Sequence, residues 1–297
     1  MDARASRRLI ALAIAAALAA GGATGAVGSP VAQASADLPW KDQVLAVVQP
    51  LADRRLSAGD GPGSPFLALG FDALGRASGD ERYATAIAQG ATPAPARPDG
   101  DAICAADGCR ADTLLGGPAL WTGPSDSDAA RATAVALDPP FRRMADTLFD
   151  RQALLFRADT ATPVEGRFDA HLNARAFVAL TRMIDALPTE DPARLEYVAW
   201  YREMARPIVR VQGPDGWWRE TLGDPAAPID RSASALYVHG LTWGLNTGML
   251  SFNEGETAAL RGWDALRSPD GLAALQSDDE GLGVLLLASA QLAERRW

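Results

Sequence analysis

The sequence contains few of the residues on which metal centres and β-sheet folds depend. Its 297 residues include two cysteines and two histidines. Two histidines are too few for a His-rich metal site, and no cofactor motif is present, so we expect neither a metal nor a cofactor. Strand signals are also weak, because no run of alternating β-branched residues is bounded by tight hairpin turns. These scarcities favour a helical protein without a metal centre.

The two cysteines, Cys104 and Cys109, stand close together in the segment Cys-Ala-Ala-Asp-Gly-Cys. A metal site would need more ligands than two thiols, and no histidine lies nearby. In an exported protein the favoured interpretation is a disulfide that closes this small loop. The alternative is a pair of reduced, unpaired thiols.

Long apolar runs are absent from the sequence after its first residues. Residues 1–36 have the organisation of a secretory signal, with a basic start, an uncharged apolar run at 9–20 and small-residue cleavage sites that end at Ala34 and Ala36. The apolar run is shorter than the roughly 20 residues of a membrane span. We therefore expect a secreted or periplasmic protein, cleaved after Ala34 or Ala36, with no membrane span in the mature chain.

The charge balance is acidic. The formal net charge is -9, and removal of residues 1–34, which hold three Arg and one Asp, would change it to -11. An acidic chain repels polyphosphate, so nucleic acid is not an expected partner. A local Arg or His can still bind a single carboxylate, so an anionic sugar remains compatible with this balance. The sequence gives no signal for an oligomeric state.

Apolar residues recur with a helical period along most of the chain. The clearest stripes are residues 44–51, 66–74, 177–187, 236–245, 258–266 and 282–292. Pro- and Gly-rich segments, such as 90–100 and 213–216, separate them and predict loops and turns. Because no segment marks a boundary between independent domains, the sequence predicts a single helical domain over residues 37–297.

Three segments resemble the unsaturated glucuronyl and rhamnogalacturonyl hydrolases of glycoside hydrolase families 88 and 105. Residues 211–218 (VQGPDGWW) resemble the family turn Q-x-x-D-G-x-W. Residues 230–236 (DRSASAL) resemble E-T-S-A-S-A-M, which opens an inner helix. Residues 78–83 (SGDERY) are similar to T-G-D-E-R-Y, a weakly specific motif. The resemblance extends from about Asp60 to Leu292.

The resemblance implies an all-α fold, the (α/α)6 toroid of six helical hairpins. In such a toroid the inner helices pack small and aromatic residues, and the loops at one end form a cleft. The family barrel is usually longer than this chain, so the resemblance also implies that one or two N-terminal helices are missing or replaced. Periodicity alone predicts only a mostly helical protein.

The resemblance also implies a catalytic carboxyl group. The family aspartate lies in a segment like D-T-L-F-M-x-x-P-F-L, which residues 111–120 match with Asp112. The nearest match to a second family carboxylate is Asp60. In the family reaction an aspartic acid protonates the C4=C5 double bond of an unsaturated uronate and water adds at C5, so one carboxyl group in an apolar cleft suffices. The alternative for Asp112 is an N-cap, which would work against acid catalysis because capping lowers the pKa.

The family segment F-W-A-R-G-N-G-W is rewritten at residues 168–175, where the sugar-facing side chains are expected. His171 replaces the arginine, Arg175 replaces the last tryptophan, and Asn173 is retained. We predict that these three residues contact the sugar, and that either Trp217 or Trp218 lies at the cleft rim. The other aromatic and histidine candidates, Trp243 and His239, lie on an apolar helix and are interpreted as core residues.

The sequence therefore favours an exported glycan-processing hydrolase that acts on unsaturated uronyl oligosaccharides of the rhamnogalacturonan type. Its expected partner is an oligosaccharide. The alternative is a non-catalytic glycan-binding or structural barrel derived from the same family. The rewritten segment at 169–175 favours this alternative, because it changes the residues that would face the sugar.

Overall fold

A computed structural model describes residues 38–89, 104–105, 108–115, 127–160 and 167–297. The predicted secretory signal at residues 1–36 lies outside this described part. Helices dominate it, as the sequence predicts. None of its helices combines the length and the apolar character that a membrane crossing requires.

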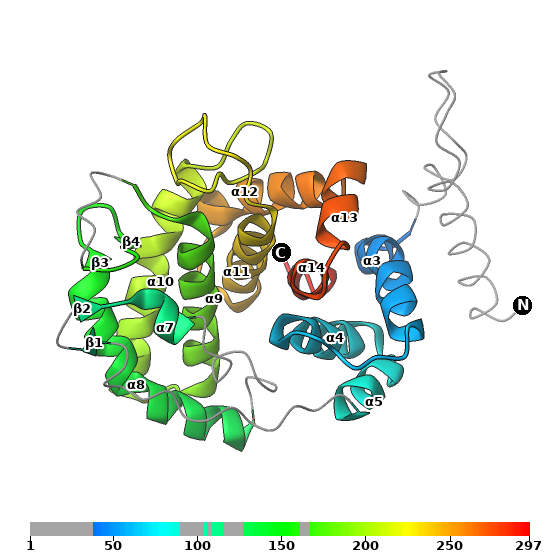
Figure 1. The fold of residues 1–297 in the computed structure, drawn as a ribbon, viewed down its shortest axis with the longest axis horizontal. Coiled ribbons are helices and arrows are strands. Elements are labelled where there is room, and N and C mark those ends of the chain that lie inside the picture. The colour runs from blue at the N-terminus through cyan, green and yellow to red at the C-terminus, as the bar shows by residue number, and fades with distance from the viewer. Residues whose placement is uncertain (1–37, 90–103, 106–107, 116–126, 161–166) are drawn as a thin grey trace, which may run out of the picture.

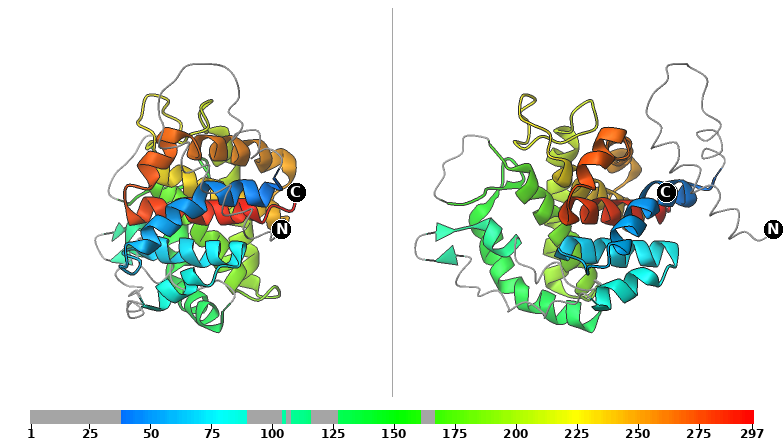
Figure 2. Two further views of the ribbon diagram at one scale, coloured as in Figure 1. Left: turned by 90° about the vertical axis from the view of Figure 1, so that its right-hand side faces the viewer. Right: turned by 45° about the vertical axis from the view of Figure 1, so that its right-hand side comes forward.

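The helices form two layers around a common axis, as Figure 1 shows. The inner helices are α4 (Pro65–Ser78), α7 (Ala111–Leu115), α9 (Ala170–Ala186), α11 (Arg231–Thr247) and α14 (Asp279–Ala293). The outer helices are α3 (Trp40–Ser57), α5 (Arg82–Gln89), α8 (Asp128–Leu148), α10 (Pro192–Arg210), α12 (Phe252–Leu266) and α13 (Pro269–Leu275). Packing runs continuously from α7 through α9, α11 and α14 to α4. In the side view of Figure 2, α3, α14 and α4 lie side by side.

The inner helices begin at residues whose side chains satisfy free backbone N–H groups. Ser64 caps α4, Asp169 caps α9, Asp230 caps α11 and Asp278 caps α14, each by accepting from an N–H of the first turn at 2.7–3.1 Å. Such caps stabilise a helix by about 1 kcal/mol each. Because the inner helices run in the same direction, their caps gather polar side chains at one end of the ring.

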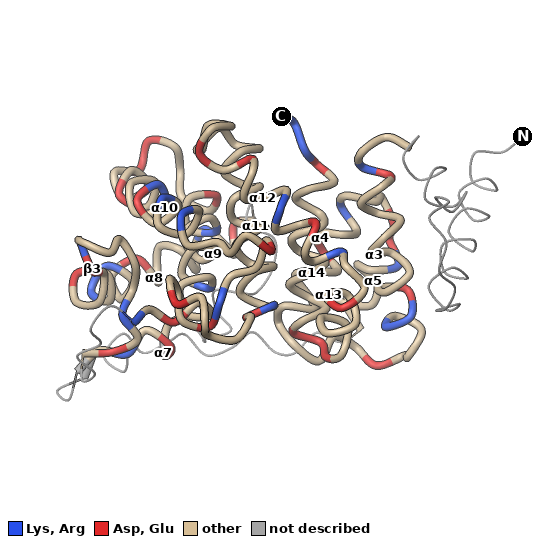
Figure 3. The backbone as a smooth tube through the Cα atoms, turned by 90° about the horizontal axis from the view of Figure 1, so that it is seen from above, with Lys and Arg blue, Asp and Glu red and all other residues tan. Residues whose placement is uncertain are grey.

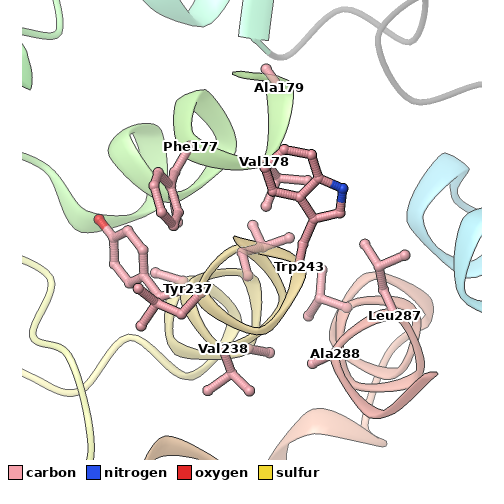
Figure 4. Packing of buried hydrophobic residues seen from close by; sticks show 14 of the residues in the cluster. Phe177, Val178, Ala179, Tyr237, Val238, Trp243, Leu287 and Ala288 are labelled. Atoms are coloured by element: carbon pink, nitrogen blue, oxygen red, sulfur yellow. The ribbon is translucent and has the colours of Figure 1, made fainter. Parts of the chain in front are cut away.

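Small residues let the inner helices approach closely. Gly70 and Gly283 face each other across the contact between α4 and α14, where an added Cβ would meet backbone atoms. Gly240 of α11 lies against the ring of Phe177. That ring stacks on Tyr201 of α10 with their centroids 4.7 Å apart. Figure 4 shows the buried side chains of α9, α11 and α14 that fill the interior between these helices.

Two short antiparallel ribbons lie beside α8 and α9. They pair β1 (Cys104–Ala105) with β2 (Gly108–Cys109), and β3 (Phe149–Asp150) with β4 (Leu155–Phe156). The register of the first ribbon sets Cys104 opposite Cys109. Directly opposite residues have neighbouring Cβ atoms, so this register is compatible with the predicted disulfide, which stays a prediction.

Candidate functional site

Four charged side chains meet where α9, α11 and α14 begin. His171 lies in the first turn of α9, with Nδ1 3.6 Å from Asp230 Oδ2 and Nε2 3.4 Å from Glu280 Oε1. One turn later on α9, Arg175 binds the same Glu280 oxygen at 2.6 Å. We call these four residues, Asp230, His171, Glu280 and Arg175, the mouth cluster. They join residues more than 100 positions apart in the sequence.

The local sequence explains this convergence. His171 and Arg175 are four residues apart, so they lie on the same face of α9. Asp230 uses Oδ1 to cap α11 through the N–H of Ala233, which leaves Oδ2 beside His171. Glu280 lies in the first turn of α14, where an acidic side chain is favoured by the helix dipole. Each residue is thus positioned by its helix, and the cluster forms because the helix starts are adjacent.

The mouth cluster holds a protonated imidazole near neutral pH. The carboxylates of Asp230 and Glu280 raise the pKa of His171 to about 9. Hydrogen bonding to His171 and Arg175 lowers the pKa of Glu280 to about 2. The side chains of His171 and Glu280 remain 33% and 39% exposed, so a ligand can reach them from solvent. The cluster therefore presents two cations and two anions to the outside.

Aromatic side chains flank the cluster. The guanidinium of Arg175 lies over the Phe66 ring at 5.3 Å, and that of Arg231 lies over the Trp217 ring at 5.7 Å. Such contacts hold a guanidinium in place while leaving its edge available for hydrogen bonds. The mouth of the ring thus carries two guanidiniums that lie against largely buried aromatic rings.

A second ion pair holds the start of α4 beside α14. Asp279 binds Arg55 of α3 at 2.6 Å, and it also accepts a hydrogen bond from the N–H of Gly63 at 2.8 Å. The pKa of Asp279 is lowered, chiefly by its hydrogen bond with Arg55. Because Glu280 follows directly in the sequence, this tether also fixes the helix turn that carries Glu280.

Asn173 has a structural role instead of the predicted sugar contact. Its side chain is fully buried, its Oδ1 accepts from the N–H of Phe156 at 2.8 Å, and its Nδ2 donates to the carbonyls of Phe156 at 3.0 Å and Asp169 at 2.9 Å. The amide thereby pairs with the backbone of β4. We correct the prediction for this residue, because its hydrogen-bonding groups are engaged inside the protein and out of reach of a sugar.

The two adjacent tryptophans differ in position. Trp218 is fully buried, and its Nε1 donates to the Ile208 carbonyl at 2.8 Å, so it is a core residue. Trp217 keeps 8% of its surface exposed and carries Arg231 over its ring. Of the two, Trp217 is therefore the one that we retain for the rim.

The two predicted acids lie outside the mouth cluster. Asp112 lies inside α7, one residue after its start, with a side chain that is 59% exposed and an oxygen 3.1 Å from Arg110. Among the described residues its carboxylate is largely exposed instead of lying in the predicted apolar enclosure. The N-cap alternative does not hold, because the helix begins before Asp112. Asp60 is exposed in the loop before α4, where its backbone carbonyl accepts from Arg55 at 2.9 Å.

The sequence analysis did not identify two members of the mouth cluster. Asp230 stands where the resembling motif E-T-S-A-S-A-M has its glutamate, so that position could have been singled out as acidic. Glu280 had no such signal, since its partners His171 and Arg175 lie more than 100 residues earlier. Only the folded arrangement reveals their contact.

A cavity of about 410 Å³ lies toward the opposite ends of the same helices. We call it the far pocket. Its walls come from α4, α9, α11 and α14, and they include Ala73, Arg182, Asp185 and Trp243. His239 also lines it, with Nδ1 3.3 Å from the Leu287 carbonyl; burial lowers the pKa of this histidine to about 4. His239 is thus a neutral interior residue, as predicted, although it borders a hollow.

Comparison with protein families places this chain among carbohydrate-active proteins. Residues 140–289 match the model of glycosyl hydrolase family 88. The chain is 28% identical over 220 residues to an unsaturated 3S-rhamnoglycuronyl hydrolase of Alteromonas sp. (strain LOR), covering 62% of this chain and 51% of that protein. It is 29% identical over 133 residues to a protein of the same name from Formosa agariphila, covering 40% and 35%. The chain thus spans about half, or less, of the length of these relatives.

Solved structures confirm the predicted architecture. A glycosyl hydrolase family 88 protein from Bacteroides vulgatus superposes with a TM-score of 0.64 at 17% identity, over 86% of this chain and 99% of that one. A possible member of family 105 from Salmonella enterica superposes with a TM-score of 0.66 at 13% identity, over 93% and 100%. At these identities the likeness shows the fold alone, which is the six-hairpin type that the sequence predicted.

Proposed function

Because this chain belongs to glycosyl hydrolase family 88, we propose that it hydrolyses unsaturated uronyl oligosaccharides at the mouth cluster. The observation that carries the proposal is the position of His171 and Arg175. Both cations lie in the family-matched region, both are held by Glu280, and the cluster can be reached from solvent. An anionic sugar needs such a fixed cationic pair.

The uronate carboxylate would bind beside Glu280. The two carboxylates of the mouth cluster balance the charges of its two cations. Among the described residues, the cation left over beside the cluster is therefore Arg231, which lies over the Trp217 ring. A further carboxylate group would be held by Arg231 together with donors of Arg175 and of His171, which is protonated near neutral pH. The rings of Phe66 and Trp217 would support the sugar site indirectly, because they hold the guanidiniums of Arg175 and Arg231 in place. The sugar would then lie across the starts of α9, α11 and α14.

The proposed reaction adds water to the C4=C5 double bond of the terminal uronate. A proton is delivered to C4 and a hydroxyl from water is added at C5, which gives a C5 hemiketal. The hemiketal opens to a C5 ketone and a C1 hemiacetal, and the hemiacetal then breaks its exocyclic C1–O bond to give an aldehyde and release the rest of the oligosaccharide as an alcohol. We retain Asp112 for the acid/base role, on its match to the family segment. Its helix α7 packs on α9, and the bound substrate would have to shield the carboxylate from water and from Arg110.

The experiment follows the ultraviolet absorbance of the double bond in lyase-generated oligosaccharides. Wild-type protein should remove this absorbance, and Asp112→Asn should lower kcat by about 10²- to 10⁴-fold. The matched control is Asp264→Asn, because Asp264 is also exposed and also pairs with an arginine, at 2.7 Å. Arg175→Ala should mainly raise KM. Full activity in Asp112→Asn would remove Asp112 from the mechanism.

A non-catalytic glycan-binding barrel is the second candidate, and one observation favours it. The carboxylate of Asp112 is hydrated and paired with Arg110, which is unlike the enclosed acid that the reaction needs. Under this alternative the wild-type protein would bind the oligosaccharides without any loss of their double bond. Binding would still weaken in Arg175→Ala.

We further propose that the protein is exported and that Cys104 and Cys109 form a disulfide. The proposal rests on the signal-like pattern of residues 1–36 and on the register of the β1–β2 ribbon. Mass spectrometry of the protein from its native host would show a chain that begins at residue 35 or 37 and lacks two hydrogen atoms. An intact N-terminus would contradict export through this signal.

A further inference from the structure

The far pocket is separate from the mouth cluster. On α9 the cluster uses His171 and Arg175, whereas the pocket uses residues 178–185. His171 and Asp185 are fourteen positions apart, which corresponds to about 20 Å of helix, and the nearest members of the two sites, Arg175 and Val178, are about 5 Å apart along the axis. On α11 and α14 the pocket likewise uses the later turns, at Trp243 and Ala290. The two sites therefore lie toward opposite ends of one helical ring.

The pocket is hollow because small residues stand where the inner helices face each other. Ala73 of α4 and Ala290 of α14 both line it. Figure 4 shows the indole of Trp243 rising from α11 into the space between Val178 of α9 and Leu287 of α14. Its Nε1 donates to Asp185 Oδ2 at 3.0 Å, which fixes the plane of the ring. The aromatic wall is thus preformed.

The charges around the pocket do not favour an anion. Arg182 lies in the wall, and burial lowers its pKa to about 10, so it remains protonated at neutral pH. Arg76 at the rim pairs with Asp72 at 2.8 Å, and the rim also carries Asp185 and Glu294. The carboxylates offset the guanidiniums, and the ends of helices carry partial negative charge. Figure 3 shows acidic and basic positions interspersed along the chain.

We propose that the far pocket binds a neutral sugar residue. The pocket wall mixes polar side chains with aliphatic ones and with Trp243, which keeps 4% of its surface exposed, and this mixture matches the polar and apolar groups of a pyranose ring. Asp185, Gln291 and Arg182 supply acceptors and donors for its hydroxyl groups. The volume of about 410 Å³ lies within the usual range of small-ligand pockets, about 300–1,000 Å³. This site does not depend on hydrolysis at the mouth, so it goes beyond the proposed function.

The test measures binding of methyl α-L-rhamnoside, a neutral sugar, to the full chain by calorimetry. D-Glucuronate serves as the anionic comparison. We expect saturable binding with a Kd of about 1–10 mM, as for a small ligand with few contacts, and at least roughly tenfold weaker binding of glucuronate to this site. The mouth variant His171→Ala/Arg175→Ala should bind the neutral sugar as well as the wild type does.

Two kinds of variant locate the binding. Ala290→Phe fills the pocket and should abolish binding, while the rim variants Asp185→Ala and Gln291→Ala should weaken it by about fivefold or more. If Ala290→Phe fails to fold, as judged by circular dichroism, the rim variants decide the question. The proposal is overturned if the wild type shows no saturable binding, if both rim variants bind normally, or if only the mouth variant loses binding. Because no turnover is measured, a negative result here leaves the proposed hydrolysis untouched.

Discussion

The two histidines of this protein lie at different depths of the same ring, His171 at a helix start and His239 midway along α11, and they have different charge states. His171 lies between Asp230 and Glu280 at the helix starts, and its pKa rises to about 9. His239 lies inside α11 among apolar neighbours, and its pKa falls to about 4. The comparison shows that position in the ring decides the charge, because carboxylate partners stabilise the cation and burial without them destabilises it.

The difference follows from how helices begin and end. A helix start leaves N–H groups free, so acidic caps such as Asp169, Asp230 and Asp278 collect there. Asp230, together with Glu280 in the first turn of α14, lies beside the cations of α9. The later turns of the same helices need no such caps. Where these turns face each other, small and aliphatic residues such as Ala73 and Ala290 leave the far pocket between them. One end therefore collects carboxylates at the helix starts, and the other carries a hollow whose wall mixes apolar side chains with the charges of Arg182 and Asp185.

The largest expected effect would come from disrupting the close contact between α4 and α14, two helices that contribute to both ends of the ring. In Gly283→Ala the new Cβ would meet the backbone of Phe66 and Leu67, which cannot move as a side chain could. We expect a loss of about 4 kcal/mol or more in the free energy of unfolding. Urea unfolding measures it. Gly255→Ala is the control, because its Cβ would find an ordinary contact at 3.4 Å; an equal loss there would contradict this account.

Asn173→Ala should test whether Asn173 stabilises the fold, unlike its charged neighbours on α9. The substitution leaves the buried N–H and carbonyl of Phe156 without their partner. We expect a loss of about 3 kcal/mol in unfolding free energy. Thermal and urea unfolding should both report it. Asn246→Ala, which removes a half-buried amide near the far pocket, should cost clearly less, and a reversed order would contradict the assigned role.

At acidic pH, protonation of His239 should lower the free energy of unfolding. Its folded pKa, about 4, is below its unfolded value near 6.5, so folding opposes its protonation. Stability is therefore full above pH 6.5 and falls as the pH drops toward 4, by about 2 kcal/mol from this group. Unfolding of His239→Gln, compared with wild type between pH 7 and 4, isolates the effect. Parallel pH curves for the two proteins would rule it out.

At alkaline pH, deprotonation of His171 should lower the free energy of unfolding, and this is the smallest of the expected effects. Its folded pKa, about 9, is above its unfolded value near 6.5, so its contribution is full below pH 6.5 and is lost as the pH rises through 9. Because the side chain is one third exposed, solvent screening reduces the contribution to about 1 kcal/mol. His171→Gln should flatten this decline between pH 7 and 10. A decline that persists unchanged would contradict the ion pairs of the mouth cluster.

The sequence predicted the helices and part of the site. Periodicity located the later turns of α9, at residues 177–187, and the resemblance directed attention to His171 and Arg175 before them. The same reasoning assigned Asn173 to the sugar, although its amide pairs with β4. It also expected an enclosed Asp112, which is exposed. Sequence spacing shows which residues share a helix face, but it does not show what that face contacts.

By itself the sequence determined the helical class and the family to which the chain belongs, because these depend on local patterns. Only the tertiary structure decided that Glu280 reaches His171 and Arg175, that Asn173 turns inward, and that a hollow lies beside Trp243. Those contacts join segments far apart in the chain. Their geometry depends on how closely α4, α9, α11 and α14 pack, which local residue preferences do not specify.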